Sequence, residues 1–411
     1  MNSKFRLALH WQILLAILLG GGYGFLFPDH VGYVSWLGDL FLRLLQMVVI
    51  PLVFCSLVSA ITGIRTTGKL GRLGFKAMAM YLLTSMLAIL TALTLVNLVR
   101  PGVGVDVSLG ENIGAMKIEA SPLRETLLNI VPKNLFADLA AGNLLPIVVF
   151  AILFGVFLAR SRDEKNVPSL IDVFDAGFTV MMKLTVFVLA FAPLGVFGIL
   201  AKNVALFAGE SDGIARLGQG LGLHFMVVFS ALVLHMFVTL PLCVRWIGKC
   251  NPWKHFRNMG AVLLTAFSTA SSNGTLPLTL RDVVEKDGVS EETAGFILPL
   301  GATVNMDGTS LYECAVVLFV AQAYGIELTF FQQCLTVLMV LLTGIGTAGI
   351  PMASLVMIVI VLNAVGLPPE GIGLVLAVDR PLDMCRTAVN VYGDTCCAVV
   401  VAKSEGEELA V

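Results

Sequence analysis

The sequence GIGTAGIP, residues 344–351, lies in the middle of 42 residues, Leu328–Pro369, that carry no formal charge. Glycine and proline interrupt helices, so two apolar half-helices are predicted on either side of it. A loop in water is normally more polar than this. Because irregular backbone at membrane depth is tolerated only where it is buried in protein or lines a cavity, the pattern predicts a re-entrant helical hairpin.

A second stretch of the same kind lies earlier in the chain. Residues 258–280 are uncharged and are interrupted at residues 268–277 by the sequence STASSNGTLP. Each interrupted stretch is followed by a long helical segment that carries charged residues. Two broken segments in corresponding positions indicate the binding site of a transporter built from inverted repeats.

The composition predicts an integral membrane protein. Hydrophobic residues make up 57% and charged residues 13% of the 411 residues, against about 45–50% and 25% in soluble domains. The mean hydropathy is +0.90. The net charge of −2 excludes a polybasic nucleic-acid binder. The eight cysteines lack zinc-site spacing, so we expect small core residues rather than metal ligands or disulfides.

Apolar segments long enough to cross a bilayer predict the spans. We expect them at Leu7–Pro28, Ser35–Gly63, Ala77–Val99 and about residues 123–161, 168–205 and 216–246. Basic residues of short loops mark the cytoplasmic side. By this rule the cytoplasmic residues are Lys4, Arg6, Arg65, Lys69, Arg72, Lys76, Arg160, Arg162, Lys165, Arg245, Lys249, Lys254 and Arg257.

The helix predicted at about residues 371–403 carries the strongest functional signal. Five polar residues fall within an arc of about 80°, at 100° per residue, whereas Arg380 lies off that arc. Each charge costs roughly 2.5–3.5 kcal/mol at the centre of a spanning helix, so this face must look inward. The five are Asp379, Asp383, Arg386, Asn390 and Asp394.

This polar face has two interpretations. One is a buried salt-bridge ladder, for example Asp383 with Arg386. The favoured one is the wall of a substrate site, because intramembrane ionisable residues are functional by default. Arg386 then offers a planar fork for a carboxylate, and Asp383 an acceptor for an ammonium group. Together they describe an amino acid with an extra carboxylate.

The sequence NMDGT, residues 305–309, forms a second cluster with Glu313. Asp307 lies mid-span beside a glycine, so the helix is predicted to be unwound there. Freed carbonyls with a carboxylate and an amide suit a hard cation, although a kinked packing helix is the plainer alternative. Glu313 is a candidate proton carrier or, with equal weight, a salt-bridge partner.

Two weaker signals accompany these clusters. YLLTS, residues 81–85, is a weak signal by itself, since Ser and Thr in membrane helices usually bond their own backbone. It indicates a functional site only if it lies near Asp307. SSNG, residues 271–274, places small polar residues at a predicted hairpin tip, where backbone N–H groups suit a carboxylate. A plain turn is the alternative.

With these motifs in order, the sequence resembles the glutamate transporter family, the dicarboxylate/amino acid:cation symporters. The resemblance covers essentially the whole chain and is most specific in NMDGT, the two hairpin tips and residues 383–394. It implies an all-α membrane protein with eight transmembrane helices and two re-entrant helical hairpins. It also implies inverted repeats, an elevator-type mechanism and a homotrimer.

The resemblance implies a scaffold and a transport domain. The scaffold comprises helices 1–2, residues 1–70, and helices 4–5, residues 120–208. The transport domain comprises helix 3, residues 71–101, and residues 214–404. Within the latter the resemblance places helix 6, hairpin 1 at about 253–286, helix 7 at about 290–324, hairpin 2 at about 329–366 and helix 8 at about 370–403.

Site residues follow position by position from the family. Arg386 is implied to bind the substrate's side-chain carboxylate and Asp383 its amino group. The other substrate positions are Thr309, Thr387, Asn390, Ser271, Ser272, Ala348 and Gly349. The first sodium site has Asp394 with Gly301, Asn305 and Asn390; the second has Thr303, Gly344, Ile345 and Thr347; the third has Tyr81, Thr84, Ser85, Asn305 and Asp307.

Some positions depart from the family's pattern. Archaeal relatives carry an arginine at the position of Ala270 and animal relatives at that of Met384, so Arg380 is the candidate replacement. Met352 replaces a small residue or Gln. Glu313 matches the proton-carrying glutamate of the animal transporters, which implies H+ co-transport beside Na+.

The sequence therefore predicts a secondary active symporter, not an enzyme, that moves L-aspartate or L-glutamate into the cell with Na+. We expect a multi-pass protein of the inner (plasma) membrane, with both termini cytoplasmic and no nucleic-acid partner. The alternative is a C4-dicarboxylate:cation symporter. Asp383 argues against it, because a substrate without an ammonium group would leave that carboxylate unpaired.

Other classes fit less well. A neutral amino acid carrier would leave Arg386 buried without a carboxylate partner. An intramembrane aspartyl protease needs two facing carboxylates, whereas Asp383 and Asp394 lie about 16 Å apart along one helix. Asp307 could still pair with one of them, but no nucleophile–base motif supports a protease. A channel does not explain two re-entrant tips meeting an Arg/Asp face.

Overall fold

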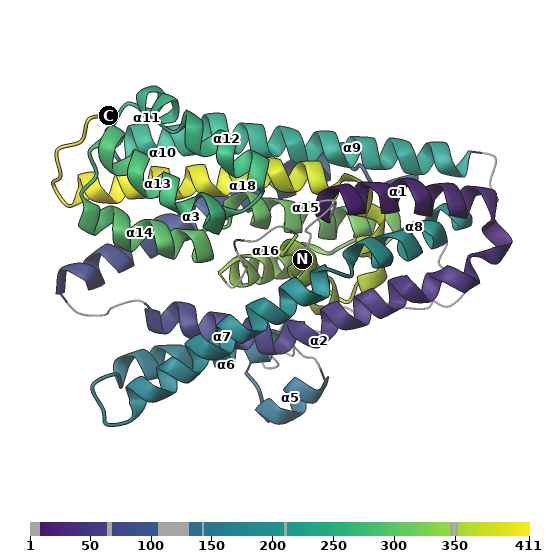
Figure 1. Cartoon of the computed structure of the whole chain (residues 1–411), viewed down its shortest axis with the longest axis horizontal. Coiled ribbons are helices and arrows are strands. Elements are labelled where there is room, and N and C mark those ends of the chain that lie inside the picture. The colour runs from purple at the N-terminus through teal and green to yellow at the C-terminus, as the bar shows by residue number, and fades with distance from the viewer. Residues whose placement is uncertain are drawn as a thin grey trace, which may run out of the picture.

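The computed structural model describes residues 9–63, 68–105, 131–141, 144–208, 212–345, 349 and 352–411, and every regular element in these ranges is helical (Figure 1). The helices before residue 209 are α1 (Leu9–Leu26), η1 (Pro28–His30), α2 (Gly32–Gly63), α3 (Gly68–Val99), α5 (Leu135–Ala141), α6 (Leu144–Arg160), α7 (Val167–Leu189) and α8 (Ala192–Ala208). Those after it are α9 (Gly213–Leu234), η2 (His235–Thr239), α10 (Leu240–Trp246), α11 (Pro252–Asn258), α12 (Gly260–Thr269), α13 (Ser272–Asp287), α14 (Glu291–Val304), α15 (Asp307–Ala323), α16 (Phe330–Gly344), α17 (Ser354–Ala364), η3 (Pro369–Gly371) and α18 (Ile372–Ser404).

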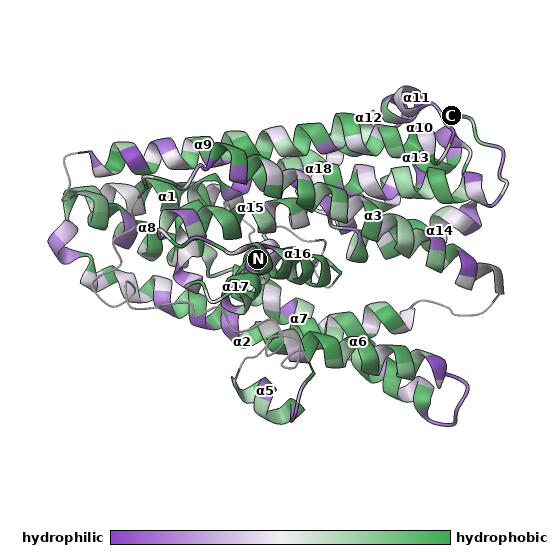
Figure 2. Cartoon of the chain, turned by 180° about the vertical axis from the view of Figure 1, so that it is seen from behind, coloured by the Kyte–Doolittle hydropathy of each residue, from purple (hydrophilic) through white to green (hydrophobic). Residues whose placement is uncertain are grey.

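The surface of the helices confirms a membrane protein. Large apolar side chains point outward along α1, α6 and α7; for example, Leu18, Phe157 and Val173 are 67%, 63% and 62% exposed. Such a surface requires lipid rather than water. Figure 2 shows hydrophobic residues over most of the long helices and hydrophilic ones gathered toward the two ends. Three helical segments, Gly32–Gly63, Gly71–Val99 and Gly213–Trp246, are long and apolar enough to cross a bilayer by themselves.

Two predicted spans each contain two helices. The span expected at 123–161 contains α5 and α6 as separate helices, and its residues 123–130 lie outside the described ranges. The span expected at 168–205 is α7 and α8, bent by 51° at Ala190 and Phe191. Pro193 explains the break, because proline lacks an N–H and disfavours helical backbone in the residue before it.

The span expected at 216–246 is continuous but irregular. It runs from α9 through the π-helical segment η2 into α10. Pro241, at the start of α10, cannot donate the backbone hydrogen bond that an α-helix would need there, which favours the wider π turn before it. His235, the first residue of η2, is fully buried.

The helices pack as two groups that share contacts. In one, α2 packs on α6, α7 and α8, and α1 packs on α8. A β-carbon on Gly24 would come within 2.3 Å of the Ala201 carbonyl oxygen, and one on Gly20 within 2.6 Å of that of Phe197, so small residues allow this close approach. In the other group, α3, α9, α12, α13, α14 and α15 pack around α18.

Both interrupted stretches form pairs of short helices. α12 and α13 are joined through Ala270 and Ser271, and Ala270 has φ +49°. α16 and α17 flank the second interruption, where Met352 has φ +62° and residues 346–348, 350 and 351 lie outside the described ranges. In both turns a non-glycine residue adopts left-handed backbone, which costs about 1–2 kcal/mol.

The C-terminal tail ties two helices together at one end of the molecule. Glu405 forms ion pairs with Arg72 and Lys76 at the start of α3, and Glu407 accepts from Ser290 and Thr293 at the start of α14. The C-terminus and the α6–α7 loop lie at this same end in both views (Figures 1 and 2). Arg72 and Lys76 thus lie at the same end of the molecule as the basic residues of the α6–α7 loop.

We predict that the Glu405 contacts stabilise the fold in a pH-dependent way. The hydrogen bond from Arg72, then that from Lys76, lowers the pKa of Glu405 to about 2 from its ordinary 4.5. A lowered folded-state pKa stabilises the protein above the unfolded-state pKa, and this stabilisation is lost as pH falls from 4.5 toward 2. Thermal unfolding in detergent should show a lower Tm for Glu405→Gln than for wild type at pH 7, with the gap closing toward pH 3. Glu408→Gln, on the exposed part of the same tail, should change nothing; a Glu405→Gln gap that is constant with pH would contradict the prediction.

Candidate functional site

A fully buried arginine organises the inward face of α18. Nε and Nη2 of Arg386 lie 3.0 Å and 2.9 Å from Oδ1 of Asp383, and Nη2 lies 3.1 Å from Oδ1 of Asp379. The guanidinium also stacks over Tyr312 of α15, 4.2 Å from the ring centre. The i,i+3 and i,i+7 spacings bring all three ionic groups onto one helix face, so the sequence builds this cluster locally.

Arg380 completes the charge balance. Its Nη1 lies 3.0 Å from Oδ2 of Asp383, although its backbone direction lies off the polar arc. The long side chain of Arg380 extends around the helix to Asp383. The direction of its Cα–Cβ bond alone does not predict this contact. The cluster therefore holds two carboxylates and two guanidinium groups. It contains the Asp383–Arg386 ion pair that the sequence left open as an alternative.

The arginine has hydrogen-bonding capacity left over. Nη1 of Arg386 has no hydrogen-bond partner within the described part of the chain, and it is buried. A guanidinium presents five N–H donors in a rigid fork that matches a carboxylate. Buried polar groups are normally satisfied, so the unused edge of Arg386 needs an explanation.

A small cavity lies beside this cluster, between the two interrupted stretches. Its volume is about 10 Å³, which is room for about one water molecule. The hydroxyl of Ser271 donates to the carbonyl oxygen of Gly349 over 3.0 Å, and the N–H of Met352 donates to Oδ2 of Asp383 over 3.2 Å. The lining residues are Ala270, Ser272, Met306, Thr309, Gly349, Ala353, Ser354, Asp383, Thr387 and Asn390. A cavity of this size is too small to hold an amino acid.

Asn390 joins α18 to the start of α15. Its Oδ1 accepts from the N–H groups of Gly308 and Thr309 over 2.7 Å and 3.3 Å, and its Nδ2 donates to Oγ1 of Thr309 over 2.9 Å. It thus satisfies N–H groups that the helix start leaves free. A β-carbon on Gly308 would come within 2.6 Å of the Arg386 carbonyl oxygen, so only glycine permits this approach.

Asp394, further along α18, is a buried carboxylate without a basic partner. Its Oδ1 accepts from Nδ2 of Asn305 over 2.9 Å, and no ion pair involves it among the described residues. A β-carbon on Gly301 would lie 2.5 Å from the same oxygen, so glycine brings the backbone of α14 up to it. Isolated buried carboxylates are costly, which makes a cation here physically favourable.

Asp307 lies on the same side of the bundle as Tyr81–Ser85. Ser85 and Thr84 donate to its Oδ1 over 2.7 Å and 3.2 Å, so the weak Tyr81–Ser85 motif does lie near it. The helix break falls at Asn305 and Met306, and Asp307 begins α15. The helix is therefore broken as predicted, but the break ends at Met306, one residue before Asp307.

Sequence reasoning missed two neighbours of these carboxylates. His235 lies 3.2 Å from Asp307, and Tyr312 stacks on Arg386. His235 stands out in the sequence as one of two histidines in an otherwise uncharged stretch, Leu217–Val244. Its partner is 72 positions away, which no local pattern specifies.

The remaining predicted residues divide into three groups. Glu313 is buried and accepts from Thr343 over 3.1 Å, without an ion pair in the described ranges. Thr303 bonds its own helix at Leu300. Gly344 ends α16 and lies against Ser310, and Ile345 is the residue that follows it. Thr347 and Ala348 lie outside the described residues.

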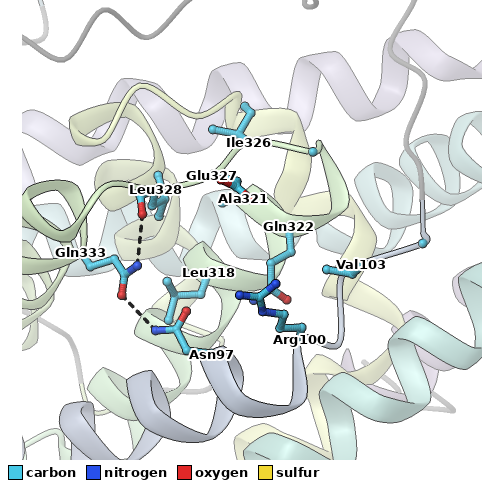
Figure 3. A pocket seen from close by; sticks show the side chains of 12 residues that line it. Asn97, Arg100, Val103, Leu318, Ala321, Gln322, Ile326, Glu327, Leu328 and Gln333 are labelled. Carbon is cyan, nitrogen blue, oxygen red and sulfur yellow. Dashed lines mark hydrogen bonds between the residues drawn. The ribbon is translucent and has the colours of Figure 1, made fainter.

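A larger cavity of about 360 Å³ lies elsewhere, at the junction of the end of α3, the end of α15 and the start of α16 (Figure 3). There Asn97 donates to Gln333 over 2.9 Å and Gln333 donates to the Leu328 carbonyl over 3.1 Å. It contains none of the residues predicted for substrate or sodium. Size alone therefore does not identify the candidate site.

Comparisons with known proteins agree on one family. The profile of the Sodium:dicarboxylate symporter family matches residues 9–404. The chain is 36% identical to the proton/glutamate-aspartate symporter of Escherichia coli (strain K12), over 98% of this chain and 94% of that protein. It is 34% identical to the proton/sodium-glutamate symport protein of Bacillus caldotenax, over 98% and 96%. It is also 31% identical to the C4-dicarboxylate transport protein of Bacillus subtilis (strain 168), over 96% and 93%.

Proposed function

The chain belongs to the sodium:dicarboxylate symporter family, and from this membership we propose that it moves an acidic amino acid, L-aspartate or L-glutamate, into the cell together with Na+ and H+. The family is one of transporters, so the chain is not an enzyme. The observation that carries the choice of substrate is the unused Nη1 of buried Arg386, whose ion-pair partner Asp383 lines the small cavity. A carboxylate is the ligand that this donor fits best.

The charges of the site support ion coupling. Asp379 and Asp383 are balanced by Arg380 and Arg386, so the cluster is neutral by itself. An acidic amino acid adds one net negative charge to a buried space, which is strongly unfavourable without a counter-ion. Asp394, which forms no ion pair among the described residues, attracts such an ion. Substrate and cation thus raise each other's affinity, and that coupling is reciprocal.

The proposed roles follow the family resemblance, position by position. Arg386 binds the side-chain carboxylate and Asp383 the amino group. Thr309, Thr387 and Asn390 complete the pocket, and Ser271, Ser272, Ala348 and Gly349 close it from the two turns. Asp394 with Gly301, Asn305 and Asn390 holds one sodium ion. Thr303, Gly344, Ile345 and Thr347 line a second cation site, and Asp307 with Tyr81, Thr84, Ser85 and Asn305 a third. Glu313 is the candidate proton carrier.

Transport then requires two movements. The Ser271–Gly349 and Met352–Asp383 contacts must open to admit the substrate and close again over it. Arg386 exchanges a contact with Asp379 or Asp383 for the substrate carboxylate. We propose eight transmembrane helices and two re-entrant hairpins in a homotrimer of the inner membrane, with both termini cytoplasmic. The group around α18 moves as an elevator against the group around α2.

A C4-dicarboxylate symporter is the second candidate. Asp383 would not remain unpaired with a substrate that lacks an ammonium group, because Arg380 and Arg386 both contact it. The relative from Bacillus subtilis carries a C4-dicarboxylate name. The contacts of Asp383 therefore do not select between the two substrate classes.

Uptake into proteoliposomes distinguishes these candidates. We expect radiolabelled L-aspartate or L-glutamate to accumulate when an inward sodium or proton gradient is imposed, and unlabelled succinate to compete weakly. Accumulation of labelled succinate, with no uptake of either amino acid, would replace the main proposal by the second. Equal uptake with and without ion gradients would exclude a symporter.

A further inference from the structure

The spanning segment α9–η2–α10 carries an exposed apolar stripe that ends in tryptophan. Other residues of α9 pack against α3, α15 and α18. Trp246, the last residue of α10, is 73% exposed, and Trp253 of α11 is 62% exposed. Tryptophan is enriched where a membrane meets water, so the two indoles mark that boundary here. The exposed residues of the stripe, at helical spacing, are Met226, Phe229, Val233, Phe237, Leu242 and Trp246.

Four basic residues accompany the two tryptophans in the sequence RWIGKCNPWKHFR, residues 245–257, here called the basic corner. This stretch contains no Asp or Glu. Arg245, Lys249, Lys254 and Arg257 are all exposed. None of the four forms an ion pair or a side-chain hydrogen bond within the described part of the chain. Their positive charge is therefore available to a partner outside the chain.

The fold fixes the direction in which the basic corner points. Oδ1 of Asn251 accepts from the N–H groups of Trp253 and Lys254 over 3.1 Å and 3.2 Å, which caps the start of α11. His255, on the inner side of α11, is fully buried, and its Nδ1 lies 2.7 Å from Oδ2 of Asp287. Because His255 anchors one side of this short helix, the exposed indole and cations lie on the other.

Other basic residues at this end of the molecule have acidic company. Arg72 and Lys76 both pair with Glu405. The α6–α7 loop, with the sequence RSRDEK at residues 160–165, has two acidic residues among its three basic ones and no tryptophan. Figures 1 and 2 place this loop, α11 and the C-terminus at the same end. The basic corner differs by combining uncompensated charge with exposed tryptophan.

We propose that the basic corner binds the headgroups of anionic phospholipids. The two indoles lie at the membrane boundary, and the cations reach the phosphodiester groups beside them. Lys and Arg extend their carbon chains along apolar surface and keep the charge in the headgroup layer. Clusters of roughly four to eight basic residues at the cytoplasmic end of a spanning helix attract anionic lipid in this way. The inference requires a membrane-spanning chain and does not depend on which substrate it carries.

Quenching of tryptophan by brominated phospholipid tests this contact. Trp11→Phe with Trp36→Phe leaves Trp246 and Trp253 as the tryptophans of the full chain. Their emission is measured in bilayers of phosphatidylcholine and phosphatidylglycerol, one of which carries bromine on the acyl chain near the headgroup. The quenching gives the relative association constant of the two lipids. We expect a preference of about fivefold for phosphatidylglycerol, which is the effect of one Lys or Arg at an anionic surface.

Matched charge variants in the same two-tryptophan background locate the preference. Combining Lys249→Gln, Lys254→Gln and Arg257→Gln should bring the ratio of the two association constants close to one. All three side chains are exposed, so the fold should be retained. A control variant removes the same charge from the α6–α7 loop and should keep the fivefold preference; it combines Arg160→Gln, Arg162→Gln and Lys165→Gln.

Equal quenching by both lipids in the unsubstituted corner, or a preference that survives in the corner variant, overturns the proposal. Salt gives a second measurement that needs no substitution. Raising the ionic strength from about 0.1 M to about 1 M shortens the Debye length from about 10 Å to about 3 Å, so the preference should fall. A preference that salt leaves unchanged also overturns the proposal.

Inorganic phosphate distinguishes a lipid headgroup from a free anion. At matched ionic strength it should not displace phosphatidylglycerol from the two tryptophans. Displacement would mean that the basic corner binds free phosphate, and the proposal of a lipid contact would be wrong. None of these measurements uses aspartate or glutamate, so a failure of the proposed function leaves their outcome unaffected.

Discussion

Arg386→Ala should abolish sodium-driven uptake of L-aspartate and L-glutamate. The guanidinium is buried, and its Nη1 has no hydrogen-bond partner among the described residues. Truncating one partner of a buried, hydrogen-bonded charge pair costs about 2–5 kcal/mol. At 1.4 kcal/mol for each tenfold change, that is a loss of roughly 30-fold or more in substrate affinity. The measurement is labelled uptake into proteoliposomes, with Kd determined separately on the purified variant.

Two further variants test the role of the paired N–H donors of the Arg386 guanidinium. Arg386→Lys keeps the charge but not the bidentate geometry, so we expect it to recover binding only in part. Arg257→Ala makes the same truncation at an exposed position of α11 and should transport as wild type does. Uptake by Arg386→Ala with an unchanged KM would contradict the assignment of Arg386 as the carboxylate ligand.

The inward face of α18 was predictable because helical geometry alone specifies it. Residues 379, 383, 386, 390 and 394 share an arc at 100° per residue, and all five are buried in the structure. The reach of Arg380 to Asp383 was not predictable from the same geometry. A side chain of that length covers positions that its backbone direction does not indicate.

The contacts of Asp307 show a second limit of sequence patterns. Thr84 and Ser85 lie more than 200 positions away, and they were linked to Asp307 only through a family resemblance. No such resemblance pointed to His235, although a histidine in an uncharged span is unusual by itself. Long-range pairing of this kind depends on how helices pack.

Breaks inside two predicted spans were missed for a different reason. Hydropathy predicted one segment at 123–161 and one at 168–205, because the apolar character continues across both breaks. The bend at Ala190 and Phe191 is set by Pro193, a local backbone effect that an average over a window conceals. Proline therefore deserves more weight than hydropathy when an apolar run is much longer than a bilayer.

The second large effect is expected for Asp394→Asn. The amide keeps an oxygen that can still accept from Asn305, so the local fold is retained, but the negative charge is lost. Removing one partner of a buried ion pair costs about 3–5 kcal/mol. The sodium concentration that half-saturates uptake should therefore rise by roughly 100-fold or more. The slope of log Kd for aspartate against log sodium concentration should fall by about one ion.

This result separates a cation site from a merely structural carboxylate. If Asp394 binds sodium, high sodium concentrations restore part of the substrate affinity by mass action, because the substitution weakens the site without removing its other oxygens. If Asp394 only supports packing, the affinity for aspartate falls equally at all sodium concentrations, and the sodium assignment is wrong. Asp172→Asn, at an exposed position of α7, controls for the change of charge alone.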